Sequence, residues 1–356
     1  MAVAKNTKNV AGRWHNIETI VKSVQDPKTF KQNIMQAAEV IKSGGLVAFP
    51  TETVYGLGAN ALDNEAAGKI YFAKGRPADN PLIVHIDKNF DIERIARDVP
   101  AGARLLMDAF WPGPLTLVLK SRAGVFSYGH MDTVALRMPK HLKAQLLIHH
   151  SGVPIAAPSA NISGRPSPTT ADHVLADLGG KIDMILDDGA CQHGVESTVI
   201  DFSESTPKLL RPGSITLKMI ENAIGKVAVA ALNGEEITPK SPGTKYRHYS
   251  PKGKLTLVIG EPQISSAKIL EMLQNSTSKS PIILAPTANK DLYANVPFIG
   301  LGRRDEEIAA NIYAVLRRCD DDEHDEIFVQ GVEEKELGVA IMNRLKKAAG
   351  ANVLEV

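Results

Sequence analysis

Short apolar runs alternate with helix-length segments along most of this chain, and that alternation restricts its fold more than any other feature. The pattern is most regular over about the last 100 residues. The strands expected there are Leu255–Ile259, Ile282–Ala285, Phe298–Leu301 and Glu326–Val329, and the helices are Ala267–Leu273, Glu306–Arg318 and Val339–Ala349. Strands that alternate with helices in this way are typical of a doubly wound, Rossmann-like parallel sheet. No Gly-x-Gly-x-x-Gly follows the first strand, so a dinucleotide site is not supported there.

Before residue 230 the apolar runs are more numerous and their spacing is mixed, which predicts one α/β domain with a mixed sheet. We expect strands at Leu46–Phe49, Leu82–Ile86, Leu115–Leu119, Thr133–Met138, Pro154–Ala157, Met184–Leu186, Ser197–Phe202 and Lys208–Leu210, and helices at Glu65–Lys74, Ala103–Phe110, Lys140–His150 and Thr170–Leu178. A polar, proline-containing stretch separates the two patterns. The expected division is an N-terminal tail at 1–30, a catalytic domain at 31–230, a linker at 231–253 and a C-terminal domain at 254–356.

Composition excludes several classes of protein. The chain has 356 residues and a formal net charge of +1, so no global field indicates a nucleic-acid partner, although a local basic face remains possible. The cysteines, Cys191 and Cys319, are far apart and lie in no metal or disulfide motif, which favours a reducing, cytoplasmic compartment. The sequence has no run of about 18 apolar residues, so it predicts no membrane-spanning helix. Residues 1–16 lack the apolar core of a secretory signal, and we expect a frayed basic tail rather than a transit peptide.

Two polar segments suggest a phosphate pocket. Lys74 and Arg76 stand two residues apart beside a proline, and so do Ser159 and Asn161. Side chains at i and i+2 of an extended segment share one face, so each pair is expected to project together. If the fold joins the segments, two cations, a hydroxyl and an amide line one pocket, which suits nucleotide phosphates. We expect both cations to face solvent in the empty cleft.

Further polar side chains lie at strand ends or in Gly/Pro loops, where binding residues concentrate. They are Thr51-Glu52-Thr53, Asn80, His85, Thr133, Arg137, Ser167, Glu196-Ser197-Thr198 and Arg211. Turn chemistry or capping explains most of them singly. Arg137 is harder to explain in this way, because it stands between Leu136 and Met138 in an apolar strand and has to reach solvent or an anion.

The motifs of nucleophilic and metal-dependent hydrolases are missing: no Gly-x-Ser-x-Gly elbow, Walker A lysine or metalloprotease histidine pair occurs. A site rich in Arg, Lys, Ser, Thr and Asn favours positioning and charge stabilisation, which is what phosphoryl and nucleotidyl transfer require beside a metal. The linker carries Lys245-Tyr246-Arg247-His248-Tyr249, an unusual composition for a mere tether.

Taken together, these residues resemble the YrdC-like family. The motifs that carry the resemblance are Phe49-Pro50-Thr51-Glu52-Thr53-Val54-Tyr55-Gly56-Leu57, Lys74/Arg76, Ser159/Asn161 and Gly194-Val195-Glu196-Ser197-Thr198. The Tyr246–Pro251 segment and the ending Val339-Ala340-Ile341-Met342-Asn343-Arg344 look like its long, two-domain branch, the threonylcarbamoyl-AMP synthases. The resemblance covers roughly residues 30 to 350. Its motifs are weak singly and highly specific in this order.

The resemblance implies a fold, a reaction and its partners. The fold is a twisted mixed-sheet domain with a concave cleft, followed by a smaller Rossmann-like domain. The reaction joins L-threonine, bicarbonate and ATP, with Mg²⁺, into threonylcarbamoyl-AMP and pyrophosphate. A downstream transferase then passes the threonylcarbamoyl group to adenosine 37 of tRNA.

Roles for individual residues also come from the resemblance. The implied L-threonine pocket is Thr53, His85, Arg137, Ala157 and Ser197. The implied ATP site is Lys74, Arg76, Asn80, Thr133, Ser159, Asn161, Ser167, Arg211 and Tyr249, with Lys74 and Arg76 as the catalytic residues. The segment 245–249 is expected to act as a lid that excludes water from the carbamate and the mixed anhydride.

Two alternatives stay open at this stage. The same cationic cleft would serve a structured-RNA-binding or ribosome-maturation factor, although the near-neutral net charge argues against it. A related enzyme could instead adenylate a different carbamate, such as that of serine.

Overall fold

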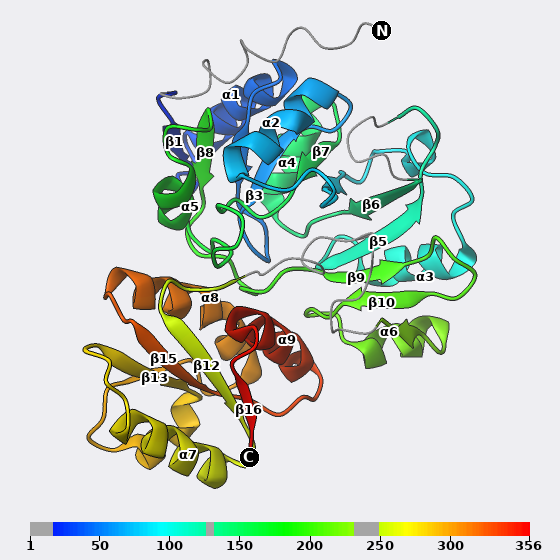
Figure 1. Ribbon diagram of the computed structural model, residues 1–356. Helices are drawn as coiled ribbons and strands as arrows, with labels where there is room; N and C mark the ends of the chain where they lie inside the picture. The colour runs from blue at the N-terminus through cyan, green and yellow to red at the C-terminus, as the bar shows by residue number, and fades with distance from the viewer. Residues whose placement is uncertain (1–16, 126–131, 231–248) are drawn as a thin grey trace, which may run out of the picture.

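The computed structural model describes residues 17–125, 132–230 and 249–356, which form two domains (Figure 1). The first is built on a sheet with the strand order β1-β8-β2-β3-β7-β4-β6-β5-β9-β10-β11. Its strands are β1 (Ile20–Ser23), β2 (Val47–Phe49), β3 (Gly56–Asn60), β4 (Ile83–His85), β5 (Leu115–Lys120), β6 (Thr133–Arg137), β7 (Ile155–Ala157), β8 (Met184–Asp187), β9 (Thr198–Asp201), β10 (Lys208–Arg211) and β11 (Ala228–Val229). β2 pairs antiparallel with β3 and parallel with β8, so the predicted mixed sheet is confirmed.

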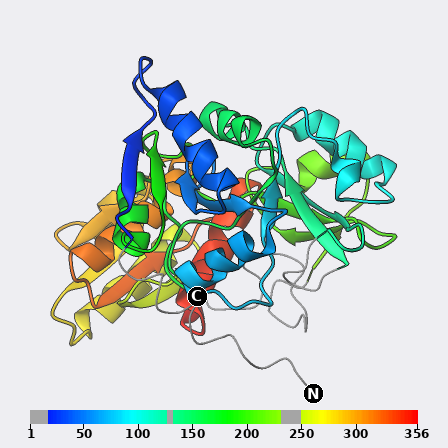
Figure 2. The same ribbon diagram turned by 90° about the horizontal axis from the view of Figure 1, so that it is seen from above.

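Helices cover both faces of this sheet. They are α1 (Phe30–Lys42), α2 (Asn64–Lys74), α3 (Ala101–Phe110), α4 (Leu142–Ser151), α5 (Ala171–Leu178) and α6 (Leu217–Ile224). Val47 and Phe49 of β2 point into the core under α1 and α4, whereas Ala48 between them belongs to the core on the other side. Alternate side chains of a strand point to opposite faces, so a strand buried on both faces has to be a continuous apolar run. Figure 2 shows α1 and α4 side by side.

Two features of the N-terminal part differ from expectation. Residues 20–23, which the sequence placed in a tail at 1–30, form the edge strand β1 and pair in parallel with β8. The helix α1 was not among the expected helices. It buries Ile34, Ala37, Ala38 and Ile41, a helical spacing that the sequence did contain.

The start and end of α2 fix the position of the first predicted phosphate residue. Asp63 caps the helix and accepts hydrogen bonds from the backbone of Glu65 and Ala66. Gly75 ends it in the left-handed conformation, with φ of 59°. Lys74 is therefore the last residue of a helix, and the prediction that it shares one face of an extended segment with Arg76 was wrong.

The C-terminal domain is a parallel sheet in the order β14-β13-β15-β12-β16, as predicted for a doubly wound fold. Its elements are β12 (Lys254–Ile259), α7 (Pro262–Gln274), β13 (Pro281–Ala285), the 3₁₀ helix η2 (Thr287–Tyr293), β14 (Phe298–Gly300), α8 (Asp305–Asp321), β15 (Glu326–Gln330), α9 (Leu337–Ala349) and β16 (Val353–Glu355). In Figure 1, α7 lies on one face of this sheet, while α8 and α9 lie on the face towards the first domain.

The two domains share a packed core. Val54 and Val195 of the first domain belong to the same buried cluster as Ile308 and Ile312 of α8. Gly194 has a φ of 71°, and a Cβ added there would lie 2.3 Å from the carbonyl oxygen of Ala309. The backbone of α8 therefore passes so close to this loop that only glycine fits.

Candidate functional site

One pocket gathers most of the predicted site residues. The predicted residues that line it are Lys74, Arg76, His85, Arg137, Ala157, Ser159, Asn161, Ser167, Ser197, Arg211 and Tyr249. Lys74 comes from the end of α2, Tyr249 from the segment that leads into the second domain, and the others from strands and loops of the first domain. The free space is about 50 Å³. Small-molecule sites usually span roughly 300–1,000 Å³, so a nucleotide needs some of these residues to move.

Three predicted residues lie outside the pocket lining. Thr53 is fully buried directly behind it and accepts a hydrogen bond from Arg137 at 3.0 Å. Asn80 holds the guanidinium of Arg76. Thr133 opens β6 opposite Lys120, four residues before Arg137.

The two predicted phosphate segments do meet in space. The Lys74 ammonium donates to the backbone carbonyl of Ser159 at 2.6 Å and also to that of Asn161. The Ser159 hydroxyl in turn donates to the Asn161 side chain at 2.5 Å. Lys74 therefore ties the end of α2 to the loop after β7, across 85 residues of sequence.

Lys74 and Arg76 are buried, being 2% and 8% exposed, so the prediction that they face solvent was wrong. The Arg76 guanidinium donates to the side chain and backbone of Asn80 at 2.6 and 3.1 Å, and to the backbone of Pro81 at 2.9 Å. All these acceptors are neutral oxygens, and within the described residues neither cation forms an ion pair. Burial lowers the pKa of Lys74 well below its ordinary value and that of Arg76 to about 10.

Arg137, whose place in an apolar strand was unexplained, reaches an anion. Its guanidinium lies 2.8 Å from the carboxylate of Glu52, and both side chains are buried. Burial alone would raise the pKa of Glu52, but Arg137 outweighs that effect and the pKa is lowered. The sequence indicated the Thr51-Glu52-Thr53 cluster and did not assign Glu52 a role. The sequence signal for Glu52 was an acidic residue beside Thr53 at a strand end, in a chain whose Arg137 needed an anionic partner.

His85 is a neutral side chain in this site. Its ring packs edge-on against Phe49, and Nδ1 lies 3.1 Å from the carbonyl of Ile83. If Nδ1 carries the hydrogen, Nε2 is left as an acceptor. Burial and the adjacent Arg137 lower the pKa of His85 to about 3, so it remains uncharged at neutral pH.

Ser197 is held from two sides. Arg211 donates to its backbone carbonyl at 3.0 Å and to its hydroxyl at 3.1 Å. Thr116 of β5, which the sequence did not single out, shares a hydrogen bond of 2.7 Å with the same hydroxyl. Thr116 sits in a strand that reads as plain core, so no sequence signal distinguished it.

A second missed acid, Glu196, joins the pocket to the other domain. Its carboxylate accepts hydrogen bonds from Ser167 at 2.6 Å, from Tyr313 at 2.9 and 3.0 Å and from Arg344 at 2.9 Å. Burial would raise the pKa of Glu196, but Arg344 and Arg211 lower it to about 2. Ser167 lies on the pocket side of this carboxylate, and the other two donors come from α8 and α9.

The described acids do not form a metal cage. In residues 17–125, 132–230 and 249–356, no group of three or more His, Cys, Asp or Glu side chains could hold a metal ion. Glu52 and Glu196 near the pocket are already engaged by arginines. Mg²⁺ commonly binds through substrate phosphates with few protein ligands, so a nucleotide-borne ion fits this site better than a resident one.

Among the helices that the structure describes, none has the length and apolar character needed to span a membrane.

Comparison with known proteins covers nearly the whole chain. Residues 39–213 match the family described as "Telomere recombination", and residues 215–350 match "Threonylcarbamoyl-AMP synthase, C-terminal domain". The chain is 47% identical over 345 residues to the threonylcarbamoyl-AMP synthase of Pyrococcus abyssi, covering 95% of this chain and 100% of that protein. It is 44% identical over 348 residues to the Bacillus subtilis enzyme of the same name, covering 96% and 99%.

Solved structures agree with the sequence comparison. The crystal structure of P. abyssi Sua5 complexed with L-threonine superposes with a TM-score of 0.88 at 45% identity. The match covers 95% of this chain and 100% of that one, so both domains are shared.

Proposed function

The chain belongs to the threonylcarbamoyl-AMP synthase family, and we propose that it joins L-threonine, bicarbonate or CO₂, and ATP into threonylcarbamoyl-AMP and pyrophosphate. The family resemblance drawn from the motifs is confirmed. In chemical class the proposed activity is nucleotidyl transfer, because an adenylyl group moves from ATP to a carbamate.

The observation that carries the ATP half is the pair of buried cations at Lys74 and Arg76, whose described partners are neutral oxygens. A buried cation without a counter-charge is unfavourable, and an anionic phosphate would supply that charge. It would also raise the pKa of Lys74, which burial lowers, and so favour its charged form. Ser159, Asn161, Ser167 and Arg211 line the same pocket and add donors for phosphate oxygens.

The threonine half centres on Arg137. We propose that its guanidinium binds the substrate carboxylate while Glu52 and Thr53 hold it from behind. His85, Ala157 and Ser197 surround the remaining space. Neutral His85 leaves the threonine amine free of a competing charge.

The reaction requires stabilisation of the charge that develops on the phosphates and exclusion of water from the site. The unprotonated amine adds to CO₂ and releases a proton, and a carbamate oxygen then attacks the α-phosphorus. The bond to pyrophosphate breaks, and Lys74, Arg76 and Arg211 stabilise the charge that builds on the leaving group. Magnesium carried by ATP would neutralise phosphate charge in addition.

Water has to be excluded from the carbamate and from threonylcarbamoyl-AMP, because both are easily hydrolysed. Tyr249, 4% exposed, lies in the pocket lining at the end of the linker. Residues 245–248 of the expected lid lie outside the described residues.

The product is a mixed anhydride, and its use requires a transferase with a nucleophilic acceptor. We propose that a downstream threonylcarbamoyl transferase carries the group to adenosine 37 of tRNA, in the cytoplasm. Direct contact of this chain with the tRNA is not required by the site.

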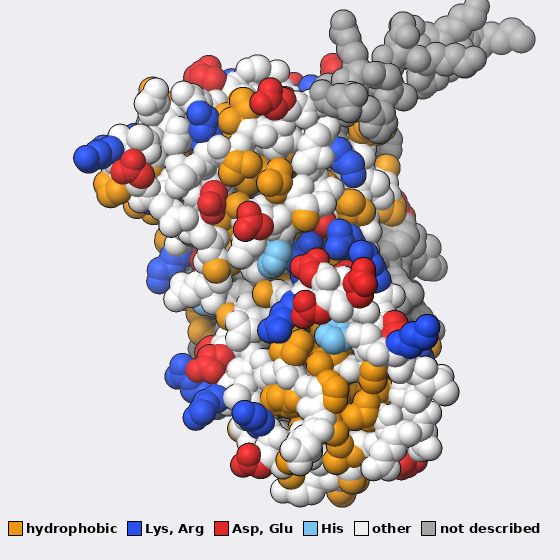
Figure 3. All heavy atoms as spheres, turned by 90° about the vertical axis from the view of Figure 1, so that its left-hand side faces the viewer, with side chains coloured by type: hydrophobic (Ala, Val, Ile, Leu, Met, Phe, Trp, Pro, Cys, Tyr) orange, Lys and Arg blue, Asp and Glu red, His pale blue; other side chains and the backbone are white. Residues whose placement is uncertain are grey.

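The alternative of a structured-RNA-binding factor finds less support. Lys74, Arg76, Arg137 and Arg211 are 2–8% exposed, so they can reach a small anion in the pocket but not a broad phosphate backbone. On the face shown in Figure 3, Lys and Arg side chains are interspersed with Asp and Glu.

ATP–pyrophosphate exchange tests the proposal. Exchange of labelled pyrophosphate into ATP is expected only when both L-threonine and bicarbonate are present. Exchange without them, or salt-sensitive RNA binding with no exchange at all, would contradict the synthase activity. Replacing threonine by serine in the same assay measures side-chain selectivity and tests the related-carbamate alternative.

A further inference from the structure

Two side chains of the C-terminal domain reach the wall of the pocket through one carboxylate. Glu196 lines the pocket, and Tyr313 and Arg344 hold its oxygens from the opposite side. All three are buried, with Arg344 only 1% exposed. We call these three residues and Ser167 the Glu196 cluster.

Arg344 contacts two pocket-forming segments at once. Its Nε donates to the Glu196 carboxylate at 2.9 Å, and Nη1 donates to the backbone carbonyl of Pro212 at 2.8 Å. Pro212 follows Arg211, and Glu196 precedes Ser197. Because Arg211 in turn holds Ser197, the planar guanidinium of Arg344 fixes the spacing of two neighbouring loops.

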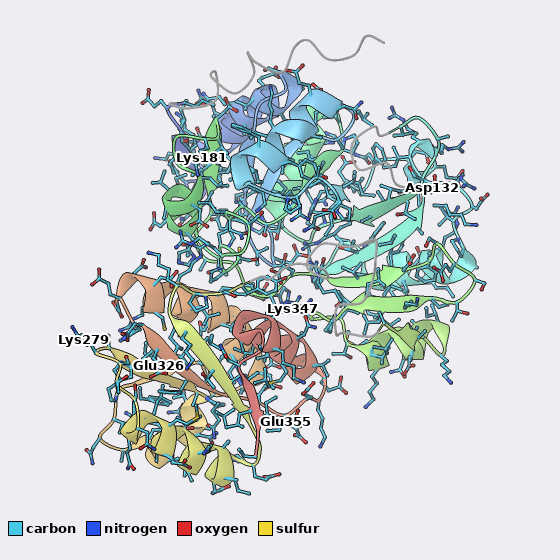
Figure 4. The ribbon with its side chains drawn as sticks, viewed as in Figure 1. Asp132, Lys181, Lys279, Glu326, Lys347 and Glu355 are labelled. Carbon is cyan, nitrogen blue, oxygen red and sulfur yellow. The ribbon has the colours of Figure 1, made fainter. Side chains whose placement is uncertain are left out.

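The same cluster holds the end of the linker. The rings of Tyr249 and Tyr313 stack with centroids 5.1 Å apart, and the Arg344 guanidinium lies 5.9 Å from the centre of the Tyr249 ring. Tyr249 has a φ of 65°, which is unfavourable for a side chain of this size and needs surrounding contacts to hold it. Figure 4 shows Lys347, one helical turn after Arg344, on the side of α9 that faces the first domain.

We propose that Arg344 and Tyr313 are positioning residues for the ATP half of the site. Through the Glu196 carboxylate they orient the Ser167 hydroxyl, and through Pro212 and Tyr249 they set the places of Arg211 and the linker end. The C-terminal domain is thus part of the active-site wall and more than a tether. This inference rests on the proposed synthase activity.

Arg344 contacts only one side of the pocket. Its partners Glu196 and Pro212 adjoin Ser167 and Arg211, whereas Arg137 and His85 are held by Glu52, Thr53 and Ile83 of the first domain. Ser197 is the threonine-pocket residue that adjoins the Glu196 cluster, so disturbing the cluster should affect ATP binding strongly and threonine binding much less. A residue that only docks the domains would not separate the two substrates.

The test compares Arg344→Met with a control, Phe328→Ala. Phe328 of β15 is also buried in the C-terminal domain, and the apolar cluster to which it belongs contains no residue of the first domain. We expect Arg344→Met to raise the KM for ATP about 100-fold, the order of effect of an ångström-scale misplacement, with a much smaller change in the Kd for threonine by calorimetry. Phe328→Ala should keep both constants within about twofold of the wild type, because a core residue remote from the pocket changes stability rather than substrate binding.

Equal effects of the two substitutions on the KM for ATP, or a parallel loss of threonine binding in Arg344→Met, would overturn the inference. If Arg344→Met does not fold, Arg344→Lys provides the test, because lysine keeps the positive charge but lacks the planar guanidinium that binds Glu196 and Pro212 at once. An unchanged KM for ATP in that variant would also overturn it. Tyr313→Phe should show the same selectivity more weakly. Wild-type exchange activity, measured first, separates failure of this inference from failure of the proposed function.

Discussion

Buried cations occur in two regions of this molecule, and their partners differ. In the pocket, Lys74 and Arg76 are held by carbonyl and amide oxygens. At the domain interface, Arg344 and Arg317 are held by the carboxylates of Glu196 and Asp177. Among the described residues, Arg344 and Arg317 are compensated by carboxylates, whereas Lys74 and Arg76 have only neutral oxygens as partners.

That difference separates a binding site from an interface. Removing one partner of a buried ion pair is strongly destabilising, because the other charge is left unpaired. Removing an uncompensated cation relieves a desolvation penalty and leaves only lost hydrogen bonds. The two regions should therefore differ in how much stability the same substitution removes: a pocket substitution should mainly lower activity, whereas an interface substitution should also lower the free energy of unfolding strongly.

The largest expected effect is on activity in the pocket. Lys74→Met or Arg76→Met should lower adenylate formation about 1,000-fold, because each removes a preorganised donor from the charge that develops on the phosphates. The rate of adenylate formation is measured with radiolabelled L-threonine, as labelled threonylcarbamoyl-AMP. Activity within tenfold of the wild type would place the catalytic charge elsewhere.

The second effect is on stability at the interface. Arg344→Met should lower the free energy of unfolding by about 3–5 kcal/mol, because Glu196 loses its counter-charge. Lys74→Met should lower it by roughly 1–2 kcal/mol, for the carbonyls it leaves without a donor. Denaturant unfolding compares them. Arg318→Met, which breaks an exposed pair with Asp322 on α8, is the control and should change stability by about 0.5 kcal/mol at most. Equal losses for Lys74→Met and Arg344→Met would remove the distinction between the regions.

A third effect concerns Arg137, a pocket cation that is paired with the carboxylate of Glu52. Glu52→Gln should raise the KM for threonine about tenfold, because Arg137 loses the group that orients it, and leave the KM for ATP unchanged. Steady-state kinetics, with threonine and ATP varied in turn, measure both KM values. A lower KM for threonine would mean instead that Glu52 competes with the substrate carboxylate. Glu39→Gln, in an exposed pair with Lys42, serves as the control.

The smallest effect is a pH dependence in two windows. Glu196 has a pKa of about 2 in the fold against 4.5 ordinarily, so its contribution is complete above pH 4.5 and is lost as the pH falls towards 2. His85 has a pKa of about 3 against 6.5, so the unfolded chain takes up its proton first and stability declines from pH 6.5 towards 3. Thermal unfolding of Glu196→Gln should lack the lower window, and that of His85→Gln the upper one. Unchanged acid profiles in both variants would contradict these assignments.

Much of the site was predictable because it rests on residue type and local order. Lys74, Arg76, Ser159 and Asn161 were chosen for their chemistry, and the structure brings them together. Their exposure was predicted wrongly, because the extended-segment argument overlooked that the helix before Gly75 includes Lys74. Glu52 and Glu196 were visible as motif letters, but their partners, Arg137 and Arg344, lie 85 and 148 residues away in sequence.

The sequence by itself determined the two sheet types, the end of α2 at a left-handed glycine, and the kinds of side chain available for phosphate and amino-acid recognition. These depend on local periodicity and on backbone preferences, which neighbouring residues set. Only the tertiary structure decided which buried cations have a carboxylate partner and that α8 and α9 complete the pocket wall. Charge compensation depends on distances between segments remote in the chain, and those distances exist only after the two domains have packed.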